Sequence, residues 1–127
     1  MADYLLDTNV IIDCLRGDLR KKEIMHRLVA DGSLLHSCEI TVAETFGGMR
    51  EEEREVTETF LGSLRYLVTE ETVARQAGEA RKSYRSKGKT LTLADALIAS
   101  LAMSRNLILL TDNIKDYPMP ELKKEKP

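Results

Sequence analysis

Short apolar segments alternate with longer helical patterns along this 127-residue chain, and this alternation restricts the possible folds more than any other feature. The apolar segments predict strands at residues 4–6, 33–38, 66–68 and 107–110. The helical patterns predict helices at residues 8–16, 18–31, 41–49, 51–64, 70–87 and 92–105. Strands that alternate with helices favour an α/β fold with a parallel sheet.

The chain has the length of one compact domain, since domains commonly contain roughly 100–150 residues. We therefore expect a single domain over residues 1–127. Residues 118–127 contain three prolines and several lysines, so we expect this tail to fray. The sequence has neither a long apolar run nor the pattern of a signal peptide, so we expect a cytoplasmic protein that does not contact membranes.

Charged residues are abundant but nearly balanced, with 19 basic and 21 acidic residues and a net charge of −2. The strongly basic composition that is typical of nucleic-acid-binding domains is therefore absent. Any contact with nucleic acid must depend on a local basic patch or on a metal ion. Cys14 and Cys38 lack the spacing of metal ligands, and we interpret them as free thiols of a cytosolic protein.

Four carboxylates occupy positions that the predicted fold brings to one edge of the sheet. Asp7 comes directly after a predicted strand and Asp112 follows another one by two residues, whereas Glu44 and Asp95 each lie near the start of a predicted helix. In a parallel sheet, the carboxyl ends of the strands and the starts of the helices that follow them share one edge, where α/β proteins bind ligands. We therefore expect these four side chains to converge.

Each of these carboxylates also has an ordinary structural interpretation. Asp7 suits the N-cap of a helix, and Asp112 suits a turn. The pattern Thr-x-x-Glu that ends at Glu44 and the pattern Thr-x-x-Asp that ends at Asp95 are typical of capping boxes. Both interpretations stay open, because caps and turns lie at the same edge as the expected cluster.

Asp95 is the most informative of the four. Between Leu93 and Met103 the only other polar residue is Ser100, and a helix that is apolar almost all round is buried. A carboxylate in such a helix requires polar partners, and a metal ion is the strongest of them.

The chemistry of the expected cluster favours a hard divalent cation. Neighbouring carboxylates repel one another and must take up protons or bind a cation. No histidine or cysteine lies in the four acidic motifs, and oxygen ligands suit Mg²⁺ or Mn²⁺. Such an ion activates water and binds phosphoryl oxygens, so the cluster predicts phosphodiester hydrolysis by a metal-activated water. Thr8 and Asn9 either support Asp7 by hydrogen bonds or only begin the following helix.

Four segments of the chain, in this order and spacing, resemble the four motifs of the PIN domain family. The segments are LLDTNVIID, ITVAETFGG, LTLADALIASLA and LILLTDNIKDY. The resemblance extends to about Tyr117 and is greatest to the VapC-type toxins of bacterial and archaeal toxin–antitoxin pairs. It implies a three-layer αβα fold with a short, mostly parallel central sheet. It also implies a Mg²⁺- or Mn²⁺-dependent endoribonuclease that acts on RNA, forms a homodimer and is inhibited by a VapB-type antitoxin.

The resemblance assigns the first three catalytic and metal-binding acids to Asp7, Glu44 and Asp95. The fourth position is ambiguous, because the family pattern of Thr-x-Asp or Thr-x-Asn before an aromatic residue has two acidic residues in or near it here. We expect Asp112 and Asn113 to share this position, with Asp112 as the stronger ligand. The residues expected in supporting roles are Thr8, Asn9, Thr111, Asn113 and Asp116.

Two further surfaces are candidates for partners. Residues 81–89 contain five basic residues and no acidic residue, and we expect Arg85, Lys87 and Lys89 to contact the RNA backbone unless this segment is only a solvated helix end. The apolar residues of the segments 41–49 and 51–64 either cover the core or receive a partner helix. They are Phe46, Phe60, Leu61 and Leu64.

Other functions fit the acidic residues less well. A non-catalytic PIN-like binding module with a degenerate acidic site is the main alternative to the nuclease. A phosphoacceptor domain of the receiver type requires an aspartate after a central strand, and the segment RYLVTEE has none. A phosphatase of the haloacid dehalogenase type requires a second aspartate two residues after Asp7, where Asn9 stands.

Overall fold

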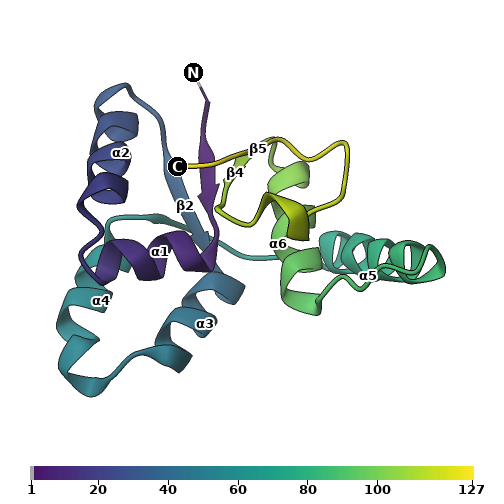
Figure 1. Cartoon of the computed structure of the whole chain (residues 1–127), viewed down its shortest axis with the longest axis horizontal. Coiled ribbons are helices and arrows are strands. Elements are labelled where there is room, and N and C mark those ends of the chain that lie inside the picture. Colours follow the sequence, from purple (N-terminus) through teal and green to yellow (C-terminus); the bar gives the residue numbers. More distant parts are fainter. Residues whose placement is uncertain (1) are drawn as a thin grey trace.

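Strand β1 lies at the centre of a five-stranded parallel sheet, in the order β3-β2-β1-β4-β5 (Figure 1). The structure is a computed structural model that describes residues 2–127. Its strands are β1 (Tyr4–Leu6), β2 (Leu35–Cys38), β3 (Arg65–Leu67), β4 (Ile108–Leu110) and β5 (Lys124–Glu125). Its helices are α1 (Thr8–Leu15), α2 (Leu19–Ala30), α3 (Glu39–Gly48), α4 (Arg54–Gly62), α5 (Glu71–Ser86) and α6 (Leu93–Ser104). Short 3₁₀ turns span Glu51–Glu53 and Ile114–Asp116.

The side chains of β1 alternate between two hydrophobic cores, one on each face of the sheet. Leu5 packs into the core that α5 and α6 cover, whereas Tyr4 and Leu6 pack into the core beneath α1, α2 and α4. Successive residues of a strand point to opposite faces, so a strand with helices on both sides must be apolar throughout. Figure 1 shows α1, α2 and α4 on one side of the sheet and α5 and α6 on the other. The expected αβα architecture is therefore confirmed.

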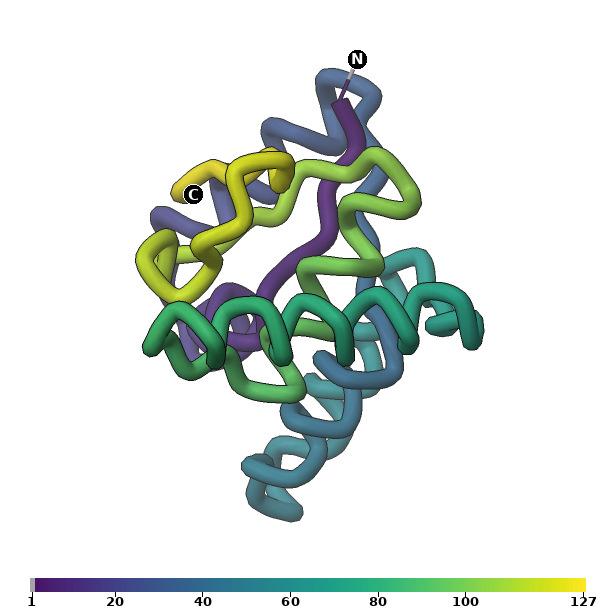
Figure 2. The backbone as a smooth tube through the Cα atoms, turned by 90° about the vertical axis from the view of Figure 1, so that its right-hand side faces the viewer, coloured from purple at the N-terminus to yellow at the C-terminus, as the bar shows by residue number. Residues whose placement is uncertain are grey.

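Helices α5 and α6 form one of the two covering layers. The middle of α6, from Ala96 to Ala102, is buried at nearly every position, as its apolar sequence predicts. Helix α5 is apolar on one face only, where Val73 and Ala77 are buried and Tyr84 is partly buried. In Figure 2, α5 lies across the front of the molecule, over the other elements of this layer.

Parallel pairing of β1 with β4 determines which residues meet at the carboxyl edge of the sheet. Leu6 is in register with Leu110, and the N–H of Asp7 donates to the carbonyl of Leu110 at 3.0 Å. The next residues, Asp7 and Thr111, therefore lie side by side. Helix α1 begins directly after Asp7, whose carboxylate accepts a hydrogen bond from the N–H of Thr8.

Helix α3 begins two residues earlier than the sequence pattern predicts. Its N-cap is Cys38, and the N–H of Cys38 donates to the hydroxyl of Thr41 at 3.0 Å. Thr41 is therefore inside the first turn, and the alternative interpretation of Glu44 as part of a capping box does not hold. Glu44 lies one turn further along α3, where its carboxylate is free to reach another element.

The expectation of a frayed tail is also wrong. Residues Met119 and Leu122 are buried in the core beneath α5 and α6, and β5 extends the sheet by pairing with β4. Figure 2 shows the C-terminal residues, in yellow, folded back against the domain. The sequence did not predict this strand, because it has only two residues and its segment is rich in prolines and lysines.

None of the helices within residues 2–127 has the length and apolarity needed to span a membrane.

Replacement of Leu122 by alanine is expected to lower the free energy of unfolding by about 2–4 kcal/mol, because it leaves a cavity in a packed core. Denaturant unfolding measures this change, and the neighbouring exposed residue provides the control variant Glu121→Ala. Equal stability of the two variants would mean that the tail does not pack as described.

Candidate active site

Asp7 is the most tightly held carboxylate at the carboxyl edge of the sheet. Its Oδ1 accepts from the N–H of Thr8 at 2.8 Å, and its Oδ2 accepts from the hydroxyl of Thr111 at 2.7 Å. The side chains of all three residues are buried or nearly so. Each carboxylate oxygen has two acceptor positions, and Asp7 lines a cavity in which a further donor or an ion would find them. Asp7 is thus both the N-cap of α1 and a residue of the site, and the two interpretations are compatible.

Glu44 reaches this edge from α3. Its Oε1 accepts from the hydroxyl of Thr8 at 2.6 Å, a contact between residues 36 positions apart in the sequence. Thr8 therefore links the carboxylates of Asp7 and Glu44, through its N–H and its hydroxyl respectively. Thr8 is a supporting residue for two of the four predicted acids.

Asp95 lies in the first turn of α6 and is half-buried. Its N–H donates to the hydroxyl of the N-cap Thr92 at 3.1 Å, while its Oδ1 accepts from the hydroxyl of Tyr117 at 3.1 Å. Burial, together with the negative charges of Asp7 and Asp116, raises the pKa of Asp95. Burial and the negative charges of Asp7 and Asp95 also raise the pKa of Tyr117 far above its usual value. The phenol therefore stays protonated and remains a hydrogen-bond donor.

One cavity of about 310 Å³ joins these carboxylates. Its polar walls come from β1–α1, α3, α6 and the segment after β4, and Asp116 faces it together with the three acids described above. The complete set of lining residues is Asp7, Thr8, Asn9, Ile12, Glu44, Asp95, Asn113 and Asp116. Three of the four acids that were predicted to converge, Asp7, Glu44 and Asp95, therefore line one cavity.

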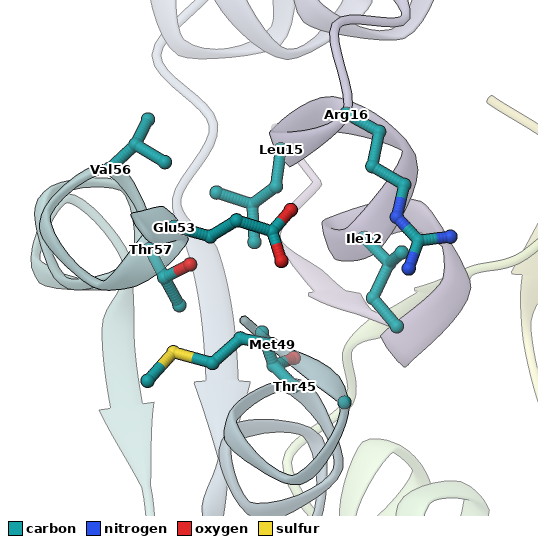
Figure 3. Close-up of a pocket in the computed structure, with 9 residues that line it drawn as sticks. Ile12, Leu15, Arg16, Thr45, Met49, Glu53, Val56 and Thr57 are labelled. Atoms are coloured by element: carbon teal, nitrogen blue, oxygen red, sulfur yellow. The ribbon is translucent and has the colours of Figure 1, made fainter. Parts of the chain in front are cut away.

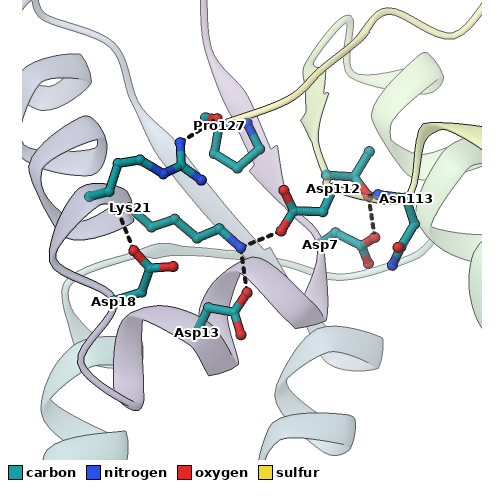
Figure 4. Close-up of polar contacts among 9 residues, drawn as sticks. Asp7, Asp13, Asp18, Lys21, Asp112, Asn113 and Pro127 are labelled. Carbon is teal, nitrogen blue, oxygen red and sulfur yellow. Dashed lines mark hydrogen bonds and ion pairs between the residues drawn. The ribbon is translucent and has the colours of Figure 1, made fainter.

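Asp112 does not line this cavity. Its Oδ2 accepts from the ammonium of Lys21, which also donates to Asp13 (Figure 4). The expectation that Asp112 is the stronger ligand at the fourth position does not match this arrangement. Asn113, which was expected to share the fourth position, lines the cavity, and so does Asp116, which was expected only in a supporting role.

The oxygen atoms of this cavity suit a divalent cation that keeps part of its water shell. Within residues 2–127, no three His, Cys, Asp or Glu side chains are placed to hold one metal ion together. Mg²⁺ is commonly bound through one or two carboxylates and retains several waters, so it does not require such a cage. The residues present, which offer carboxylate, amide and hydroxyl oxygens, therefore fit this mode of binding.

A second cavity, of about 350 Å³, adjoins the first and shares Asp95 and Asp116 with it. Lys89 and Lys115 belong to its walls. Lys89 was expected to contact RNA, whereas Lys115 was missed, because a single lysine between hydrophobic and acidic residues carries no pattern. Arg85 and Lys87 line neither cavity, and Lys87 lies over the ring of Tyr84, 5.3 Å from its centroid.

Comparison with known proteins agrees with this fold. The family model of the PIN domain matches residues 4–117. Ribonuclease VapC19 of Mycobacterium tuberculosis is 31% identical over 119 residues, which cover 93% of this chain and 95% of that protein. Ribonuclease VapC10 of the same species is 36% identical over 117 residues, which cover 92% of this chain and 87% of that protein.

Solved structures give the same result. The crystal structure of VapBC2 from Rickettsia felis, bound to a DNA fragment from its promoter, contains a chain with a TM-score of 0.86 and 26% identity. The match covers 98% of both chains. The chain described here therefore belongs to the PIN domain family. Within that family it is a toxin ribonuclease of the VapC type.

The variant Asp95→Asn is expected to stabilise the metal-free protein at pH 7. Because the native pKa of Asp95 is raised, the stability that its protonated form contributes is complete below the unfolded-state value of about 3.9 and is lost as the pH rises through the native pKa. Asparagine removes the cost of the ionised group and still accepts from Tyr117.

The measurement is thermal unfolding with a chelator at pH 3 and pH 7. The variant and the wild type should differ at pH 7 and converge at pH 3. A variant that is less stable than the wild type at pH 7 would contradict the electrostatic interpretation.

Proposed function

We propose that this VapC-type ribonuclease cleaves RNA internally with Mg²⁺ or Mn²⁺ bound at the acidic cavity, and that a VapB-type antitoxin inhibits it. The observation that carries the proposal is the meeting of Asp7, Glu44, Asp95 and Asp116 in one cavity although they come from distant parts of the chain. The homodimer, the cytoplasmic location and the single-domain organisation remain predictions.

A bound divalent ion would supply an activated water and would stabilise negative charge on the phosphoryl oxygens. The protein orients these carboxylates through hydrogen bonds, in which a neighbouring group donates to a carboxylate oxygen. Thr8 and Thr111 orient Asp7, Thr8 also orients Glu44, and Tyr117 orients Asp95. These donors leave the remaining acceptor positions of the carboxylates for the ion and its waters.

The raised pKa of Asp95 supports this role. Repulsion between Asp95 and its neighbours Asp7 and Asp116 disfavours the ionised site when no cation is bound. A cation reverses this effect, because it favours the charged form of every carboxylate around it. The site thus has an intrinsic preference for a positively charged ligand.

Replacement of Asp7 by asparagine is expected to lower kcat/KM for RNA cleavage by roughly 100-fold or more, because it removes a charged ligand and keeps the side chain's shape. Cleavage assays with Mg²⁺ or Mn²⁺, with and without a chelator, measure this change. The exposed residue after α2 provides the matched control Asp31→Asn, which should behave as the wild type. If Asp7→Asn cleaves as well as the wild type, the nuclease assignment of this cavity is wrong, and a binding module with a degenerate acidic site becomes the better account.

The cavity that contains Lys89 and Lys115 supports RNA as the substrate. It shares Asp95 and Asp116 with the acidic cavity, so a phosphate next to the scissile one would lie beside two lysines. Exposed lysines contact phosphates without reading the bases, which suits an RNA backbone.

The double variant Lys89→Gln/Lys115→Gln is expected to weaken RNA binding and its salt dependence. For single strands each phosphate contact contributes about 0.7 to the slope of log K against log salt, so the slope should fall by about 1.4. Binding is measured in chelator, which prevents cleavage. The control Lys22→Gln/Lys82→Gln removes the same charge from exposed positions outside both cavities. An unchanged slope would exclude Lys89 and Lys115 from the RNA path.

A groove between α1, α3 and α4 supports a helical antitoxin segment as the partner. Its walls combine apolar side chains with one arginine and one glutamate, and Figure 3 shows Leu15 and Glu53 directed toward the space between the helices. The complete lining is Ile12, Leu15, Arg16, Thr45, Gly48, Met49, Glu53, Val56 and Thr57. Two of the structures that match this chain are of VapBC complexes bound to DNA, and this supports a VapB-type partner. Phe60, Leu61 and Leu64 cover the core instead of lining this groove.

Replacement of Val56 by glutamate is expected to weaken antitoxin binding by roughly tenfold or more, because it places a charge on an apolar wall that a partner helix must cover. Val56 is 53% exposed, so the fold should tolerate the change. The control is Val29→Glu, at a position on α2 that is 56% exposed and outside the groove. Calorimetry with the antitoxin tests this prediction, and equal affinities of the two variants would place the partner elsewhere.

A further inference from the structure

Lys21 is a buried cation that contacts two carboxylates next to the proposed active site. Its side chain is only 5% exposed, whereas those of Asp13 and Asp112 are 41% and 37% exposed. Its ammonium donates to both of them and so joins α2 to α1 and to the segment after β4. Figure 4 shows the lysine between these two carboxylates, with Asp7 and Asn113 beyond Asp112.

The position of Lys21 is itself well determined. It lies in the first turn of α2, where its N–H donates to the N-cap Asp18 at 3.0 Å. Burial alone lowers the pKa of a lysine, but the hydrogen bonds and charges of Asp112 and Asp13 outweigh burial, and the pKa of Lys21 is raised. The ammonium therefore stays charged, and its removal would leave the two carboxylates without a counter-charge.

Residues 111–113, which follow β4, direct their side chains to two different sides. The hydroxyl of Thr111 donates to Asp7 and accepts from the N–H of Asn113 at 2.9 Å, and Asn113 lines the acidic cavity. Between them, Asp112 points to Lys21 instead. Asp112 lies at a bend between Thr111 and Asn113, so an ion pair that fixes its side chain also restricts the orientations of its two neighbours.

We propose that Lys21 is a positioning residue for the metal-binding site, because its ion pair with Asp112 holds Thr111 toward Asp7 and Asn113 toward the cavity. The statement that Lys21 affects metal binding rests on the proposed function. In this proposal Asp112 anchors residues 111–113 and is not a metal ligand. Lys21 itself touches neither the cavity nor Asp7, so its effect is transmitted through residues 111–113.

Amide hydrogen exchange of the metal-free protein tests the positioning directly. In Lys21→Met the amide of Asn113 should exchange about tenfold faster than in the wild type, since its acceptor Thr111 is held less well. Asp112→Asn should have the same effect, and the double variant should exceed neither single variant, because both remove one interaction. The control is Lys22→Met, an exposed neighbour on the same helix. Unchanged exchange at Asn113 in both single variants would overturn the proposal.

Mn²⁺ binding, measured by calorimetry at 25 °C, tests the consequence for the site. Lys21→Met should raise the Kd for Mn²⁺ about fivefold or more, whereas a loss of global stability alone would lower the melting temperature and leave this Kd unchanged. If Lys21→Met does not fold, Asp112→Asn decides, because Lys21 keeps Asp13 as a partner there.

The outcomes separate the inference from the proposed function. A wild-type protein that binds Mn²⁺ and cleaves RNA, with a Lys21→Met variant of equal Kd, would overturn the role of Lys21 and leave the function standing. A strong effect of Asp112→Asn on Mn²⁺ binding without faster exchange at Asn113 would make Asp112 a ligand and would also overturn the proposal. A wild-type protein without Mn²⁺ binding would remove the proposed function, while the exchange measurement would still report on the segment.

Discussion

The parallel pairing of β1 with β4 is the constraint on which the rest of the site depends. This register places Asp7 beside Thr111, and the hydrogen bond between their side chains joins the two ends of the domain across 104 positions of sequence. Thr8 then connects Asp7 to Glu44 on α3, and Tyr117 reaches Asp95 on α6. One strand pairing thus gathers carboxylates that would repel one another if the folded core did not hold them.

The features that depend on local pattern were predictable from sequence. Alternating strands and helices, together with the apolar runs that form β1, β4 and α6, led to the αβα fold. The positions of Asp7 and Asp95 followed from the ends of these elements, and both side chains reach the cavity as expected. Glu44 reaches it as well, although α3 begins at Glu39 and not at Thr41.

The features that depend on the direction of single side chains were not predictable. Asp112 and Asn113 are adjacent in the sequence, yet their side chains point in different directions. Asp112 points away from the cavity to Lys21, which is 91 residues away in the sequence. The order of the tail was not predictable for a related reason, because β5 forms by pairing with β4 and its own composition does not favour a strand. In both cases a tertiary contact outweighs the local propensity of the segment.

The most direct test of this account is a crystal structure with Mn²⁺, in which anomalous scattering locates the ion without reference to the protein model. The account predicts an ion in the cavity between Asp7 and Asp95, coordinated partly through water, while Asp112 remains bound to Lys21. An ion coordinated by Asp112, or no ion in this cavity at millimolar Mn²⁺, would contradict it.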